Sequence, residues 1–253
     1  MEMKEQLVFI SGASRGLGAS LARSFAREGA RVVINYYQSR DIAEALAEEL
    51  GDRAFAVYAD IRDETEVGQA VTEAEAHFDR PVTTIVNNAL VGFKFDPAAQ
   101  KAADRLSWED YQTQLDGSLK GPFHLVQACL PGMKAAGFGR IINVGTNLVQ
   151  NPVVAYHEYT TAKAALLGFT RNMAKELGAE GITVNMVSGG LLRETDASRV
   201  TSDEVFGIIE ATTPLQRVTT PDELADAVLF FSSPWSRAVT GQNLVVDGGL
   251  VMD

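Results

Sequence analysis

The stretch LVFISGASRGLG, residues 7–18, decides the fold, because four apolar residues run directly into three glycines at positions 12, 16 and 18. Leu21, Ala22 and Phe25 then recur at helical spacing, so the glycines lie between a predicted strand and a predicted helix. Glycine allows a tight turn and close approach of a ligand, and the free amides of a helix start attract phosphate. An ordinary strand-to-helix turn is the alternative, but this position favours a dinucleotide-binding turn. Its residues would be Gly12, Ser14, Arg15, Gly16, Leu17 and Gly18.

The same alternation of short apolar runs and helical patterns continues along the whole chain. Six further runs predict strands, at residues 31–36, 54–59, 83–87, 140–144, 182–187 and 243–247. Continuously apolar strands separated by helices are typical of a parallel sheet that is covered on both faces. The sequence therefore predicts an α/β, doubly wound Rossmann fold with a seven-stranded parallel sheet and helices on both faces. Since no linker, repeat or shift in composition interrupts it, residues 1–253 are expected to form a single domain.

The composition limits the classes of partner. The chain has 253 residues, with 22 Lys and Arg against 33 Asp and Glu, and its net charge of −11 argues against binding nucleic acid. A single cysteine, Cys129, and three histidines without paired spacing predict neither a disulfide nor a metal site. The N-terminus lacks a signal-peptide pattern, and no apolar run is long enough to cross a bilayer. We expect a cytoplasmic protein without a membrane partner.

The end of the second predicted strand bears on the choice of dinucleotide. It reads INYYQSR over residues 34–40, with no carboxylate before Asp41. NAD sites carry an acidic residue here for the ribose hydroxyls, whereas a 2′-phosphate would meet no repulsion. Arg15 and Arg40 could bind that phosphate, although Arg40 could equally begin a solvated helix. We therefore expect NADP(H) rather than NAD(H), with contacts from Asn35, Tyr36, Ser39 and Arg40.

A second motif, YTTAK at residues 159–163, places a phenol and an ammonium on one helix face. A nearby ammonium stabilises phenolate. The pair therefore predicts a pKa for Tyr159 that is lowered from about 10 toward neutral, which suits a general acid or base.

Together these motifs resemble the short-chain dehydrogenase/reductase family, in particular its 3-oxoacyl-[acyl-carrier-protein] reductases. The resemblance extends through Asp60-Ile61, Asn87-Asn88-Ala89 and Asn185 to TGQNLVVDGG at residues 240–249. It implies that Tyr159 protonates the substrate oxygen and that Lys163 also binds the nicotinamide ribose. It further implies a homodimer or homotetramer formed through the terminal strand. The remaining cofactor contacts that it implies are Asp60, Ile61, Asn88, Ala89, Tyr159, Gly189, Gly190 and Leu192.

The chain departs from the family at two catalytic positions. Thr146 stands where the family has a serine that holds the substrate carbonyl; it keeps the hydroxyl, and its methyl fills pocket volume. Ser118 stands where an asparagine holds a water that relays protons to the lysine. Ser118 could hold that water with its hydroxyl, or it could simply pack.

Three departures surround the expected cofactor site. Leu90 replaces a glycine, and Gly189 replaces a proline, which frees the backbone there and makes the loop costlier to order by roughly 0.4–1 kcal/mol. Glu194 takes the place of a threonine that contacts the carboxamide, and Thr195 could serve only if the loop shifts.

The leading interpretation is an NADPH-dependent oxidoreductase that reduces a small-molecule carbonyl compound, such as a 3-oxoacyl thioester or another ketone. One alternative is an NADP-binding sensor or scaffold with impaired catalysis. Another is an alcohol dehydrogenase for a sugar or steroid, because the proton and hydride steps are reversible. The segments 90–106 and 188–220 lie beyond strand ends and are expected to wall the substrate pocket.

Overall fold

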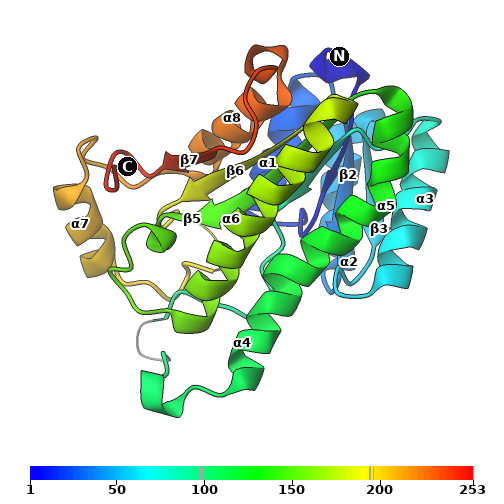
Figure 1. Ribbon diagram of the computed structural model, residues 1–253. Coiled ribbons are helices and arrows are strands. Elements are labelled where there is room, and N and C mark those ends of the chain that lie inside the picture. The colour runs from blue at the N-terminus through cyan, green and yellow to red at the C-terminus, as the bar shows by residue number, and fades with distance from the viewer. Residues whose placement is uncertain (97–99, 194, 196, 253) are drawn as a thin grey trace.

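The computed structural model describes residues 1–96, 100–193, 195 and 197–252. Its seven strands form one parallel sheet in the order β3-β2-β1-β4-β5-β6-β7, which confirms the predicted doubly wound architecture (Figure 1). All seven predicted strands are present. They are β1 (Leu7–Ile10), β2 (Arg31–Tyr36), β3 (Ala54–Tyr58), β4 (Thr84–Asn87), β5 (Gly139–Thr146), β6 (Ile182–Gly189) and β7 (Asn243–Val246).

Strands β5 and β6 run two residues further than the sequence pattern predicts. Thr146 pairs with Gly189 at the end of their ladder, and Gly189 pairs with Val246 of β7 on its other side. The two extensions carry polar and small residues, which an apolar pattern does not detect. They bring Thr146 and Gly189 to the carboxyl edge of the sheet.

Helices cover both faces because successive strand residues point to opposite sides. Val8 and Ile10 of β1 pack beneath α1 (Gly16–Arg27), α2 (Arg40–Leu50) and α8 (Pro221–Ser232). Leu7 and Phe9 pack beneath α3 (Glu64–Phe78), α5 (Gly121–Ala136) and α6 (His157–Leu177). Figure 1 shows α5 and α6 side by side in front of the sheet. All four of these β1 side chains are fully buried, each contributing roughly 1.5–3 kcal/mol.

Two shorter helices lie in the connections that follow β4 and β6. Helix α4 (Trp108–Leu115) continues through a π-helical turn, η4 (Asp116–Lys120), into α5, and α7 (Asp203–Thr212) follows β6. Position 117 of the π-helical turn requires a glycine, because a Cβ there would lie 2.8 Å from the Cβ of Val91. Single 3-10 turns complete the path: η1 (Met3–Glu5), η2 (Gly51–Arg53), η3 (Ala103–Arg105), η5 (Asn147–Val149), η6 (Gly178–Glu180) and η7 (Pro234–Ser236).

The strand order places the site. The chain winds outward from β1 in one direction to β3 and in the other to β7, so a crevice opens where β1 and β4 meet. The segments that contain Phe95 and Ala197, which follow β4 and β6, are joined to each other, since the backbone N–H of Phe95 donates to the oxygen of Ala197 over 3.0 Å. In the part of the chain that the structure describes, no helix is both long and apolar enough to cross a membrane.

Candidate active site

A cavity of about 780 Å³ lies at the carboxyl ends of the strands and runs from the glycine turn to the YTTAK helix. The structure brings together there nearly every cofactor contact that the sequence predicts. The predicted residues that line it are Gly12, Ser14, Arg15, Gly16, Leu17, Gly18, Asn35, Tyr36, Ser39, Asp60, Ile61, Asn88, Ala89, Tyr159, Lys163, Gly189, Gly190 and Leu192.

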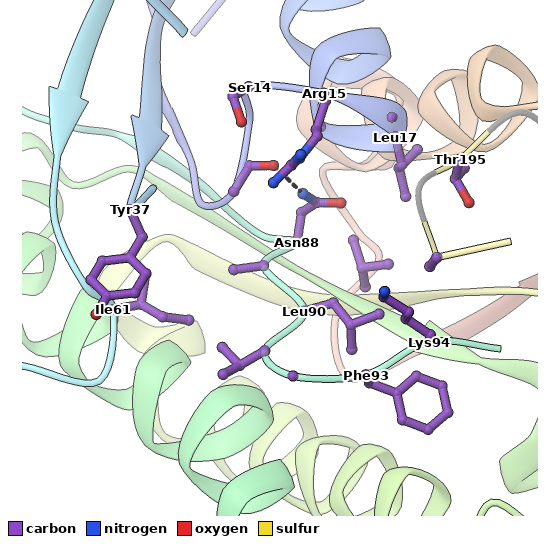
Figure 2. A pocket seen from close by; sticks show the side chains of 18 of the residues that line it. Ser14, Arg15, Leu17, Tyr37, Ile61, Asn88, Leu90, Phe93, Lys94 and Thr195 are labelled. Atoms are coloured by element: carbon purple, nitrogen blue, oxygen red, sulfur yellow. Dashed lines mark hydrogen bonds between the residues drawn. The ribbon is translucent and has the colours of Figure 1, made fainter. Parts of the chain in front are cut away.

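The glycine turn, residues 12–18, leads into α1 along the cavity and carries Ser14, Arg15 and Leu17 (Figure 2). We call this turn the cradle. Gly12 has a φ of +64°, and a Cβ on it would lie 2.9 Å from the Cα of Ala89. A Cβ on Gly18 would lie 2.3 Å from the backbone oxygen of Gly12, so only glycine fits. Helix α1 begins after Arg15 without a side chain that caps its first amides, within the described chain. These amides and the helix dipole can therefore receive a pyrophosphate.

Three side chains hold this turn in place. The amide oxygen of Asn35 accepts from the Gly12 N–H at 3.2 Å, and its nitrogen donates to the Ala59 oxygen at 3.1 Å. Asn88 donates to the backbone oxygens of Ser11 and Gly12 at 2.9 and 3.1 Å. The Ser11 hydroxyl accepts from the N–H of Asn88 at 3.0 Å. The side chains of Asn35 and Asn88 thus bond to backbone groups of the turn and its neighbours, and they fix its conformation.

Of the two arginines expected near a 2′-phosphate, the structure places one, Arg15, in the described lining of the cavity. Arg40 does not belong to the described lining. The Arg40 side chain is 71% exposed and pairs with Glu44 one turn along α2 at 2.9 Å. An ion pair this exposed is screened by solvent and contributes little, so a phosphate could draw Arg40 away from it. Its contact with the cofactor stays a prediction.

Arg62 is a lining residue that the sequence reasoning missed. Its guanidinium bonds to both carboxylate oxygens of Asp60, the shortest distance being 2.6 Å, and it lies 5.7 Å from the ring centroid of Tyr37. Hydrogen bonding from Arg62 keeps the pKa of Asp60 below its ordinary value. The cation two residues after Asp60 was visible in the sequence, and a search for basic residues beyond strand ends would have found it.

The phenol of Tyr159 and the ammonium of Lys163 lie next to each other on the buried face of α6. Only 4% of Tyr159 and 3% of Lys163 is exposed. The Lys163 nitrogen lies 5.9 Å from the centroid of the tyrosine ring and donates to the backbone oxygen of Val144 at 2.7 Å. Since both residues line the cavity that begins at the glycine turn, a dinucleotide in the cradle could extend to them.

The expected lowering of the tyrosine pKa is wrong for this structure. Burial raises the pKa of Tyr159 to about 12, although a hydrogen bond with the Thr146 side chain opposes that rise. Burial also lowers the pKa of Lys163 from 10.5 to about 8. The spacing revealed the neighbouring ammonium but not the depth of the pocket, and desolvation of the phenol is the largest cause of the rise. Tyr159 is therefore a neutral phenol at neutral pH, which suits a proton donor.

The other two predicted catalytic residues lie outside the described lining of the cavity. Thr146 is buried at the end of β5, and its hydroxyl contacts the Tyr159 side chain and accepts from the Leu148 N–H at 3.3 Å. Ser118 is buried in the π-helical turn η4. One turn earlier, Gln114 donates to the Val91 oxygen at 3.0 Å, while its buried Oε1 lacks a partner in the described chain. The relay role of Ser118 stays a prediction.

The end of β6 and the residues after it also line the cavity. Gly189 is not a loosened loop residue, because it ends β6 and a Cβ there would lie 2.7 Å from Leu224. Thr195 lines the cavity, and its hydroxyl lies 2.7 Å from that of Ser198. Glu194, the alternative to Thr195, lies outside the described residues.

Comparisons place this geometry among known proteins. A model of the family described as "Enoyl-(Acyl carrier protein) reductase" matches residues 12–251. A 3-oxoacyl-[acyl-carrier-protein] reductase of Synechocystis sp. is 35% identical over 98% of this chain and 97% of that protein.

Two solved structures share the fold and contain a cofactor. A gluconate 5-dehydrogenase from Burkholderia cenocepacia, in complex with NADP and tartrate, is 30% identical with a TM-score of 0.87 and covers 97% of this chain and 94% of its own. A blue fluorescent protein from a metagenomic library, in complex with NADPH, is 34% identical with a TM-score of 0.86 and covers all of both chains.

Proposed function

Because the chain belongs to the short-chain dehydrogenase/reductase family and is an oxidoreductase of that family, we propose that it reduces a small-molecule carbonyl compound to an alcohol with NADPH. One observation carries the proposal: Tyr159 and Lys163 are buried together in the cavity that begins at the glycine turn. The NADP and NADPH found in the two related structures support the choice of cofactor.

The described residues fit the cofactor. The turn can fold this tightly only because Gly12 and Gly18 lack a Cβ, and the first amides of α1 would then bind the pyrophosphate. At the adenosine end, Tyr36, Tyr37, Gln38 and Ser39 line the cavity without a carboxylate, while Asp60 is neutralised by Arg62. An additional 2′-phosphate would therefore meet arginine rather than an unpaired acid.

The chemistry divides between cofactor and protein. When bound, NADPH supplies the hydride for the carbonyl carbon. Tyr159 donates its phenolic proton to the carbonyl oxygen, and its raised pKa keeps that proton in place at neutral pH. Thr146, which already contacts Tyr159, would donate a hydrogen bond to the same oxygen.

Lys163 has two parts in this proposal. Its hydrogen bond to the Val144 oxygen holds α6 against the end of β5 and so fixes the position of Tyr159. With a pKa near 8, it can return a proton to the phenolate after each turnover. Ser118 would hold a water that connects the lysine to solvent.

Turnover by the purified protein tests the proposal. NADPH absorbance is followed with 3-oxoacyl thioesters, diketones and quinones, in the wild type and in Tyr159→Phe. Oxidation of NADPH by the wild type alone supports the reductase. Tight NADPH binding with no turnover of any carbonyl would favour a sensor or scaffold instead.

A further inference from the structure

Aromatic rings surround the phenol of Tyr159 in a way that the proton-transfer chemistry does not require. The ring of Phe93 stacks on that of Tyr159, with centroids 4.3 Å apart and planes inclined by 12°. The ring of Phe95 meets Tyr159 edge-on at 5.6 Å and 87°. Tyr156 meets Phe93 edge-on at 5.1 Å and 85°. We call Phe93, Phe95 and Tyr156 the aromatic wall.

The aromatic wall belongs to an apolar cluster, of which Leu90, Phe93, Phe95 and Tyr159 line the cavity. Leu148 and Val154 complete this cluster, and the Thr146 side chain meets it at Tyr159. Phe93 is only partly buried and lines the same cavity as Tyr159, so a substrate in that cavity could contact its ring. Figure 2 shows Phe93 on the segment that also carries Leu90 and Lys94.

Hydrogen bonds anchor the backbone on both sides of Phe93. Before it, the Val91 oxygen accepts from the Gln114 side chain at 3.0 Å. After it, the Phe95 N–H donates to the Ala197 oxygen at 3.0 Å, and the Phe95 oxygen accepts from Thr201 at 3.3 Å. Two separate segments, α4 and the stretch between β6 and α7, thus fix the backbone that carries Phe93.

We propose that Phe93 determines specificity, and that the aromatic wall selects planar, apolar carbonyl compounds such as aryl and conjugated ketones. The inference rests on the proposed carbonyl reduction. A planar ring beside the reacting carbonyl gains stacking contact with Phe93. A polyhydroxylated sugar acid would gain no such stacking contact, and any hydroxyl that it placed against these apolar rings would lose water without gaining a partner from them.

Two diketones that differ by one ring test this selection: 1-phenyl-1,2-propanedione and 2,3-butanedione. Their kcat/KM values with NADPH are compared as a ratio, because a general loss of activity in a variant lowers both values equally and leaves the ratio unchanged. We expect the wild type to favour the phenyl compound about tenfold or more, and Phe93→Leu to reduce the ratio by about 2- to 12-fold. Phe93→Tyr keeps a ring and should keep the ratio. Trp108→Ala, which removes a 70% exposed aromatic ring outside the cavity lining, is the matched control.

A binding measurement separates this inference from the proposed function. Calorimetry with NADPH-loaded Tyr159→Phe, which should not turn over, gives the Kd ratio of the two diketones directly. A phenyl preference that falls in Tyr159→Phe/Phe93→Leu supports the aromatic wall, even if the wild type reduces neither compound and the proposed function fails. Turnover of both diketones with equal kcat/KM, or a ratio that Phe93→Leu leaves unchanged, overturns the inference alone.

Discussion

The ammonium of Lys163 donates a 2.7 Å hydrogen bond to the backbone oxygen of Val144, at a point where only 3% of the lysine is exposed. This contact joins α6 to β5 two residues before Thr146. It also satisfies one of the lysine's donors but leaves its positive charge in an environment where burial lowers the pKa to about 8.

This burial predicts how stability depends on pH. Between pH 8 and 10.5 the unfolded chain binds a proton at Lys163 that the folded chain has lost, so the free energy of unfolding rises with pH in that window. The shift corresponds to about 3 kcal/mol over the full window. Because Lys163→Met cannot titrate, the wild type should gain stability relative to the variant as pH rises.

Urea unfolding of both proteins from pH 7 to 10 measures that difference. The upper limit avoids Tyr159, whose pKa of about 12 makes stability fall between pH 10 and 12. A difference between wild type and Lys163→Met that stays flat over this range would be inconsistent with a lysine of lowered pKa.

Gly→Ala substitutions should have opposite effects on stability in the glycine turn and in α6. In Gly18→Ala the new methyl would lie 2.3 Å from a backbone oxygen that cannot move away, so stability should fall by about 1–3 kcal/mol and NADPH binding should be lost. In Gly168→Ala, within α6, the methyl meets nothing within 4 Å. Stability should rise there by about 0.5–1 kcal/mol. Thermal melts and calorimetry with NADPH check both, and equal effects at the two sites would disprove the close approach.

Arg15 should set the preference for NADPH over NADH. Removing a charge-assisted contact to the 2′-phosphate costs about 1.5–3 kcal/mol, so Arg15→Ala should weaken NADPH binding by about 10- to 100-fold and NADH binding far less. Arg40→Ala should act in the same direction but more weakly, because Arg40 must first leave Glu44. Equal losses for both cofactors, or tighter binding of NADH by the wild type, would reject the assignment.

Thr146 should act through its hydroxyl and not its methyl. Thr146→Ser keeps the donor and should retain kcat within about tenfold, whereas Thr146→Val should lower it by about 10²–10³-fold. A thermal melt of each variant controls for the hydrogen bond from the Leu148 N–H, which only Val removes. If Thr146→Val turns over as well as Thr146→Ser, the hydroxyl does not hold the substrate oxygen.

The sequence predicted the sheet and the cradle because local patterns determine both. Each strand carries β-branched or apolar residues, and Gly12, Gly16 and Gly18 follow β1 at a spacing that few other structures require. Tyr159 and Lys163 were predictable as neighbours because four residues make about one helical turn.

Other features depend on contacts between distant segments. The stacking of Phe93 on Tyr159 and the bond from Phe95 to Ala197 join segments that no local pattern relates. The raised pKa of Tyr159 follows from burial that those segments help to create. The pairing of Arg40 with Glu44 was local and visible in the sequence, but its competition with a 2′-phosphate could not be judged from spacing.

The central claim is that the chain is a reductase in which Tyr159 donates the proton, and one comparison tests it most directly. The rate of NADPH oxidation with a reducible diketone is measured for the wild type and Tyr159→Phe, with the Kd for NADPH determined for both. We predict a loss of about 10²–10⁴-fold in kcat with a far smaller change in the Kd for NADPH. A Tyr159→Phe enzyme that binds NADPH and turns over at the wild-type rate would contradict the account.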